Sequence, residues 1–188
     1  MRTILFLLSL TFASIFSKGQ QRQPFIPDTT VNQIKINDYR STERVLGKDV
    51  WKNLFESKGS LPRIEVVNNT KTESLRLIFH YGGSKNSVDE FEIAGIDKSY
   101  KIPKQAIVLA TATFITGNNI RLGMSKEEVV KILGAGYKSN VKGKAEELLY
   151  TLNNKSGFVR RYNQYEYYIR CLFRNGVLLK YSFGFTAV

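Results

Sequence analysis

The sequence contains very few of the side chains from which metal sites and nucleophilic active sites are built. Its 188 residues include one cysteine, Cys171, one histidine, His80, and one tryptophan. A lone cysteine cannot form an intrachain disulfide, and its position far from the N-terminus predicts that the protein carries no lipid anchor there. One histidine and one cysteine are too few for a convincing zinc site, so we expect no metal and no cofactor.

Acidic residues are also scarce, because 16 of them stand against 28 basic residues and the formal net charge is +12. Residues 118–188 hold 12 basic and 5 acidic side chains, whereas residues 20–117 hold 14 and 11. This excess favours an anionic partner, either an acidic protein or an anionic envelope component such as lipid headgroups or acidic glycan. The alternative is a basic protein without such a partner, because net charge governs solubility and encounter rather than fold.

Long apolar runs are absent except at the N-terminus. Residues 4–16 form an apolar run behind Arg2, and the small residues Ser17 and Gly19 follow it. This order is typical of a secretory signal peptide, and the run is shorter than the roughly 20 residues of a membrane-spanning helix. We therefore predict a signal peptide over residues 1–19, no transmembrane segment in the mature chain, and no nucleic-acid partner. The shortage of cysteine favours an exported bacterial protein, either periplasmic or secreted.

Proline is rare, and two of the four prolines, Pro24 and Pro27, fall in residues 20–33. This polar stretch has neither helical nor strand periodicity, so we predict a flexible lead there.

Two short helices are indicated by their boundary residues. In the second, Ser125 and Glu128 have the spacing of a capping box, and Gly134 is placed to end the helix. In the first, Asp38 is placed to cap a helix that ends before Gly47. The two patterns are offset by 87 positions throughout, which points either to an internal repeat or to coincidence.

Strand-like segments follow each helix pattern, so the predicted fold class is α+β. We expect two tandem units, each a short helical segment packed on an antiparallel sheet, over residues 34–117 and 118–188. In the first unit the strand-like segments are residues 63–68, 75–81, 90–96 and 106–114.

The C-terminal segment has the clearest strand signal, with a turn at Asn175 and Gly176. A three-residue loop that pairs Phe173 with Val177 gathers the apolar and aromatic residues on one face, and this is the register we predict. It buries Cys171 as a core residue rather than a reactive thiol. It also places Arg170 opposite Lys180 on the outer face. The predicted partner-binding face consists of Tyr168, Arg170, Leu172, Lys180 and Ser182; the alternative is a solvated face screened by salt.

Catalytic groups do not converge in the sequence. His80 lies on the polar side of a predicted strand with no nucleophile signature nearby, which favours a structural role. The densest acidic cluster is Asp89, Glu90 and Glu92, whose alternation sends the two glutamates toward solvent. We expect that the protein is not an enzyme. The alternative is a small envelope hydrolase that uses paired carboxylates from distant strands. Convergence of the acidic side chains of the first half in one cleft would distinguish the two.

The stretch "NNIRLGMSKEEVVKILGAG", residues 118–136, resembles the helix-start signature of small exported α+β domains of the BamE (SmpA/OmlA) type and of the β-lactamase-inhibitor-protein-like (BLIP-like) fold. The resemblance is best over residues 118–188. It implies a non-enzymatic protein whose helices cover one sheet face while the other face or its loops meets a partner, as an inhibitor or an assembly factor does. The matching positions are structural, namely Ile120, Leu122, Gly123, Met124, Ser125, Val129, Leu133 and Gly134. No functional residue is carried over, and the chain departs from the assembly-factor pattern by lacking a lipid-attachment cysteine.

Overall fold

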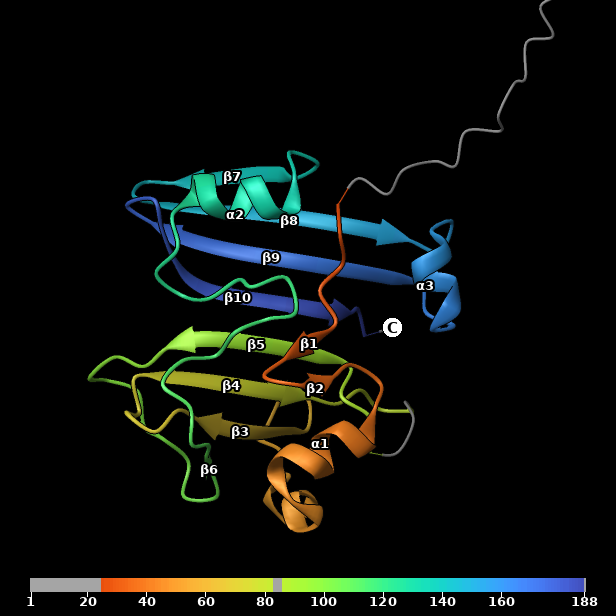
Figure 1. Ribbon diagram of the computed structural model, residues 1–188, viewed down its shortest axis with the longest axis vertical. Coiled ribbons are helices and arrows are strands. Elements are labelled where there is room, and N and C mark those ends of the chain that lie inside the picture. Colours follow the sequence, from red (N-terminus) through yellow and green to blue (C-terminus); the bar gives the residue numbers. More distant parts are fainter. Residues whose placement is uncertain (1–24, 83–85, 188) are drawn as a thin grey trace, which may run out of the picture.

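A computed structural model describes residues 25–82 and 86–187. The predicted signal peptide and residues 20–24 of the predicted lead lie outside these ranges. The α+β prediction is confirmed, because one large mixed sheet carries a few short helices and a small two-stranded sheet (Figure 1).

The large sheet has the strand order β6-β3-β4-β5-β10-β9-β8-β7, so the two halves of the chain share one sheet and meet where β5 pairs with β10. All neighbouring strands are antiparallel except β3 and β6, which are parallel. The bounds are β3 Arg63–Val67, β4 Glu73–Ile78, β5 Glu90–Gly95, β6 Ile107–Val108, β7 Lys138–Lys142, β8 Ala145–Asn153, β9 Glu166–Arg174 and β10 Val177–Phe185.

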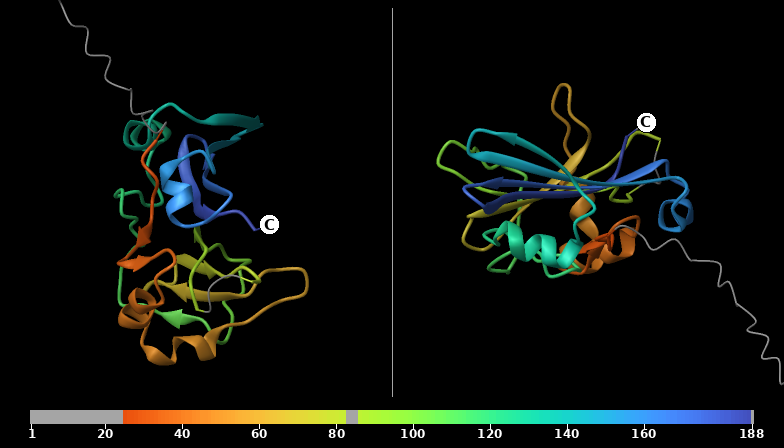
Figure 2. Two further views of the ribbon diagram at one scale, coloured as in Figure 1. Left: turned by 90° about the vertical axis from the view of Figure 1, so that its right-hand side faces the viewer. Right: turned by 90° about the horizontal axis from the view of Figure 1, so that it is seen from above.

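The helices α1 (Tyr39–Leu46) and α2 (Lys126–Leu133) lie on the same side of this sheet, as the view from above shows (Figure 2). The small sheet of β1 (Thr30–Val31) and β2 (Ile34–Lys35) lies on that side too. The 3-10 helix η1 (Lys48–Asn53) follows α1, and α3 (Gly157–Arg161) connects β8 to β9. We call the other side of the sheet the open face.

Both predicted helices begin and end where their boundary residues predict. The Asp38 carboxylate accepts hydrogen bonds from two backbone amides of α1, and Ser125 and Glu128 form the predicted capping box of α2. Gly47 and Gly134 end the two helices at the same positive φ of 90°, a value that residues with a side chain rarely adopt. Because each helix is only eight residues long, packing on the sheet must stabilise it.

The core lies between the sheet and the helices. Alternate residues of every long strand point into it, as the period of two requires. The strand residues of this core include Ile64, Val66, Leu75, Leu77, Phe91, Ile93, Leu148, Tyr150, Tyr167, Ile169, Cys171, Tyr181, Phe183 and Phe185. Cys171 is fully buried, as predicted, and burial raises the pKa of its thiol.

The predicted flexible lead differs from what residues 25–33 do in the structure. Phe25 is buried against Tyr150, with ring centroids 5.2 Å apart, and Val31 in β1 is fully buried. The segment also pairs with the chain near residue 115, where the first half ends. There the backbone N–H of Asn32 donates to the Ile115 carbonyl at 3.0 Å. Long-range contacts order this segment, rather than a regular helix or a long strand. Such contacts leave no periodic pattern in the sequence, and this is why the sequence predicts a flexible segment.

The predicted register of the C-terminal hairpin is wrong at the turn. Asn175 and Gly176 form a two-residue turn, with φ of 52° and 76°, and Val177 pairs with Arg174. A bulge between Leu178 and Lys180 then shifts the pairing by one residue, so Tyr181 lies opposite Cys171. The two-residue turn is therefore compatible with an apolar core face, because the bulge restores the alternation of β10 against β9.

The other strand predictions differ in extent. The strands predicted from residues 63, 75 and 90 correspond to β3, β4 and β5, but the segment 106–114 contributes only the two residues of β6. No strand is predicted at β7 or β8, because β7 has no buried side chain and charged residues obscure the alternation of β8.

Candidate binding face

The open face carries all five residues of the predicted partner-binding face. Ser182 lies directly opposite Arg170, and Lys180 lies opposite Leu172, so both pairs share one side of the sheet. The predicted register placed Arg170 opposite Lys180, and this pairing is wrong. The Arg170 side chain is exposed, Tyr168, Leu172 and Lys180 are partly buried, and Ser182 is buried.

A chain of ion pairs crosses the open face from β3 to β10. Arg76 on β4 binds Glu65 at 3.2 Å on one side and Glu92 at 2.5 Å on the other, and Lys180 binds the second oxygen of Glu92. The Glu65 side chain is fully buried, so its charge needs this partner. Burial lowers the pKa of Arg76, but its bond to the Tyr100 hydroxyl and the two carboxylates outweigh this effect and raise it.

A second polar row is centred on Glu90. Its carboxylate accepts a hydrogen bond from the Tyr168 hydroxyl and lies 2.5 Å from the Nε2 atom of His80. Burial and the Glu90 charge raise the pKa of the Tyr168 hydroxyl, so this group stays a donor. Gly184 lies between Tyr168 and Glu90 in the sheet, and a Cβ there would come within 2.3 Å of the Asp89 carbonyl oxygen. The missing side chain leaves room for the tyrosine to reach across β10.

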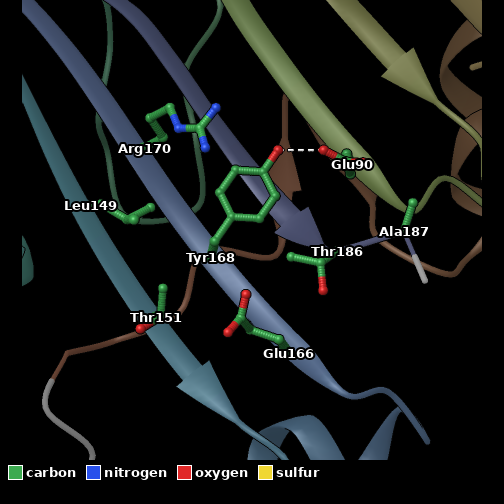
Figure 3. Close-up of a pocket in the computed structure, with 8 residues that line it drawn as sticks. All are labelled: Glu90, Leu149, Thr151, Glu166, Tyr168, Arg170, Thr186 and Ala187. Atoms are coloured by element: carbon green, nitrogen blue, oxygen red, sulfur yellow. Dashed lines mark hydrogen bonds between the residues drawn. The ribbon is translucent and has the colours of Figure 1, made fainter. Parts of the chain in front are cut away.

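A cavity of about 260 Å³ opens beside this row, near the end of β10 and the start of β9 (Figure 3). Its lining consists of Glu90, Leu149, Thr151, Glu166, Tyr168, Arg170, Thr186 and Ala187. The Arg170 guanidinium lies 5.5 Å from the centre of the Tyr168 ring and pairs loosely with Glu147 at 3.6 Å. An exposed cation over an aromatic ring is available to an anionic group.

A smaller hollow of about 120 Å³ lies on the same face toward β7, lined by Asn140, Lys142, Ala145, Glu147 and Leu172. Three exposed cations surround this part of the face, namely Lys138, Lys142 and Arg174. Within residues 25–82 and 86–187, these three have no acidic partner, whereas Arg170 and Lys180 each have one. The second half of the open face therefore carries an uncompensated positive charge.

Three acidic side chains of the first half, Glu65, Glu90 and Glu92, lie on the open face, and each is engaged. The others do not join them, since Asp28 is buried in the core and Asp38 caps α1. Glu90 and Glu92 do point away from the core, as their alternation predicts, yet each side chain is only 13 % exposed. Glu65 and Glu92 bind Arg76, and Glu90 binds His80 and Tyr168. His80 therefore holds a carboxylate in place. The sequence placed these residues on the polar side of their strands, but it contained no signal for which cation meets which carboxylate.

No group of three or more potential metal ligands occurs in the part of the chain that the structure describes. In the same residues, no helix combines the length and the apolar character needed to cross a bilayer. Comparison with models of known families, with curated proteins and with solved structures finds no match for this chain.

Proposed function

We propose that this chain is an exported, non-enzymatic binding protein of the bacterial cell envelope, acting in the periplasm or outside the cell. Its partner contacts the open face over β8, β9 and β10, around Tyr168, Arg170, Leu172, Lys180 and Ser182. The observation that carries this proposal is the asymmetry of the sheet: α1, α2 and the small sheet cover one side, and the open face presents cations, a tyrosine and two hollows.

An acidic protein is the partner that best fits this surface. The uncompensated cations Lys138, Lys142 and Arg174 would attract it, and electrostatic attraction of this kind sets the rate of encounter. The hollow beside Tyr168 and Arg170 can receive one projecting side chain, which is the usual geometry of an interface anchor. Inhibition or assisted assembly of the partner is the corresponding mode of action, in line with the resemblance of residues 118–136.

We further propose that the chain consists of two related helix-plus-sheet units. The two eight-residue helices start 87 residues apart, and each ends at a glycine with φ of 90°. The strand order is also mirrored about the β5–β10 pair, with β4 and β9 next and β3 and β8 beyond them. Superposition of α1, β3, β4 and β5 on α2, β8, β9 and β10 should align these elements in this pairing. A superposition that fits only with different pairings would contradict common origin.

Site-specific crosslinking tests the binding proposal. A photoreactive amino acid in place of Leu172, or in place of Arg170, should crosslink the mature protein to an envelope protein, and the yield should fall as salt is raised. The same amino acid at Lys98, an exposed position in the first half, is the matched control. Crosslinks of equal yield at Lys98 and at Leu172, or crosslinks to lipid alone, would contradict the proposal.

A further inference from the structure

The outer edge of β7 is an unpaired strand edge. β7 is the last strand of the sheet order, and all five of its residues, Lys138–Lys142, are exposed. Among the described residues, its backbone forms hydrogen bonds with β8 only. An exposed edge presents a row of free N–H and C=O groups, which is a template for another strand.

The opposite edge of the sheet offers much less. β6 is only two residues long, and the chain around it bends back onto the first half, where the Asn53 side chain donates to the Gln105 carbonyl at 2.8 Å. A short edge strand is one of the ways in which proteins protect a sheet from edge pairing. β7 is therefore the edge with the length to accept a further strand.

The side chains of β7 select the chemistry of an added strand. Lys138 and Lys142 lie on the open face, since Lys138 pairs with Leu149, which lies opposite Arg170, and Lys142 pairs with Ala145 beside the smaller hollow. Val141 projects to the helix side and is 64 % exposed. Side chains directly opposite one another across a strand pair lie within contact distance, so acidic residues would pair with the two lysines.

A second copy of this chain fits the edge poorly. Antiparallel pairing of two β7 strands about Asn140 would place Lys138 of one copy opposite Lys142 of the other. Like charges directly opposite destabilise a strand pair. Both lysines therefore oppose self-association and favour an acidic occupant.

We propose that the outer edge of β7 binds an extended acidic segment of the partner protein as an additional antiparallel strand. The segment carries acidic residues four positions apart, opposite Lys138 and Lys142, and an apolar residue opposite Val141. This inference rests on the proposed binding function and specifies how the partner is held: backbone hydrogen bonds supply the register and the lysines supply selectivity.

A labelled peptide of alternating glutamate and valine, seven residues in length, is a direct probe. Fluorescence polarisation with the mature protein should give a Kd below about 1 mM, and about tenfold tighter binding than a lysine and valine peptide. The variant K138E/K142E should lose about tenfold in affinity for the glutamate peptide. Two variants with the same change in charge, K98E/K101E and R170E/K180E, should bind it nearly as well as the wild type.

Backbone methylation separates strand pairing from simple charge attraction. Two versions of the glutamate peptide are methylated on alternate backbone nitrogens, one on each edge, so that their charges are identical. One version should lose binding and the other should keep it, because an added strand uses a single edge. Equal binding of the two versions, or no binding of the parent peptide at 1 mM, would overturn the proposal, as would a dimer of the wild type that K138E/K142E abolishes.

The two proposals can fail separately. If the peptide fails while Leu172 still crosslinks to an envelope protein, edge pairing is wrong and open-face binding stands. If the peptide binds β7 while positions 170 and 172 crosslink no protein, edge pairing stands and the contact over β9 and β10 is wrong.

Discussion

Asp28 is a buried carboxyl group that joins the N-terminal segment to the core of the second half. Its Oδ2 atom accepts a hydrogen bond from the Tyr181 hydroxyl at 3.0 Å, and Oδ1 accepts one from the backbone N–H of Asn118 at 3.1 Å. The Tyr167 hydroxyl donates to the Asp28 carbonyl at 2.6 Å. Burial raises the pKa of the Asp28 carboxyl from 3.8 to about 6, against the lowering effect of its hydrogen bonds.

This raised pKa makes stability depend on pH in a defined direction. The folded state binds the Asp28 proton more tightly than the unfolded state, so the contribution is complete below pH 3.8 and is lost as pH rises through about 6. Relative to Asp28→Asn, which stays neutral, the wild type should lose about 2 kcal/mol of unfolding free energy between pH 4 and pH 7. Urea unfolding of both proteins across this range measures the difference. Parallel pH profiles for the two proteins would show that Asp28 does not titrate as described.

His80 and Glu90 provide a second test at the scale of single residues. Burial lowers the pKa of His80, but the bond to Glu90 and the charges of Asp89 and Glu90 outweigh it, and the pKa lies above its ordinary value of 6.5. Glu90→Gln should therefore lower the pKa of His80, whereas Glu92→Gln should leave it nearly unchanged. NMR titration gives the value without ambiguity, because the chain has one histidine. A His80 pKa that is the same in Glu90→Gln and in the wild type would contradict this pairing.

At the scale of elements, Gly184 governs how β10 fits between β5 and β9. Its φ is 153°. A side chain there would collide with the backbone of Glu90, the first residue of β5, and of Asp89, the residue before it. Gly184→Ala should reduce the unfolding free energy by about 1–3 kcal/mol, the usual cost of overpacking. Gly95→Ala in β5, where no atom lies within 4 Å of the new Cβ, should change it by less than about 0.5 kcal/mol.

Chemical denaturation of the two alanine variants measures both values. The Gly184 variant should also release Tyr168 from Glu90, which lowers the pKa of the tyrosine hydroxyl toward its ordinary value. An unchanged stability of Gly184→Ala would mean that β5 can shift to admit the side chain.

At the scale of the whole molecule, the β5–β10 pair joins the two halves into one sheet. Phe91 and Phe183 lie directly opposite each other in this pair, with ring centroids 5.1 Å apart, and both are fully buried. Residues 25–31 add further contacts between the halves, since Phe25 packs on Tyr150 and Val31 bridges to Thr116. The halves are therefore expected to unfold together.

Phe183→Ala tests this cooperativity. The change should cost about 3–5 kcal/mol, and it should shift the unfolding midpoint of both halves equally. Trp51 fluorescence reports on the first half, and hydrogen exchange of the β8 and β9 amides reports on the second. A Trp51 transition that stays at its wild-type midpoint would show that the halves unfold independently.

The predictable parts of the fold are those specified by local patterns. The capping residues of α1 and α2 define both helices to the residue, because a cap requires particular side chains at particular positions. The open-face position of Tyr168, Arg170 and Lys180 was likewise predictable, since alternation alone sends a residue to one side of a strand. Alternation does not reveal the bulge after Leu178, and this is why the predicted pairing of Arg170 with Lys180 is wrong.

The amino-acid sequence by itself determined the α+β class, the two capped helices, the burial of Cys171 and the basic character of the second half. Each of these depends on neighbouring residues or on composition. Only the tertiary structure decided that both halves share one sheet, that residues 25–31 complete the core, and that Arg76, Glu92 and Lys180 meet on the open face. These features depend on strand order and register, which arise from contacts between residues far apart in the chain.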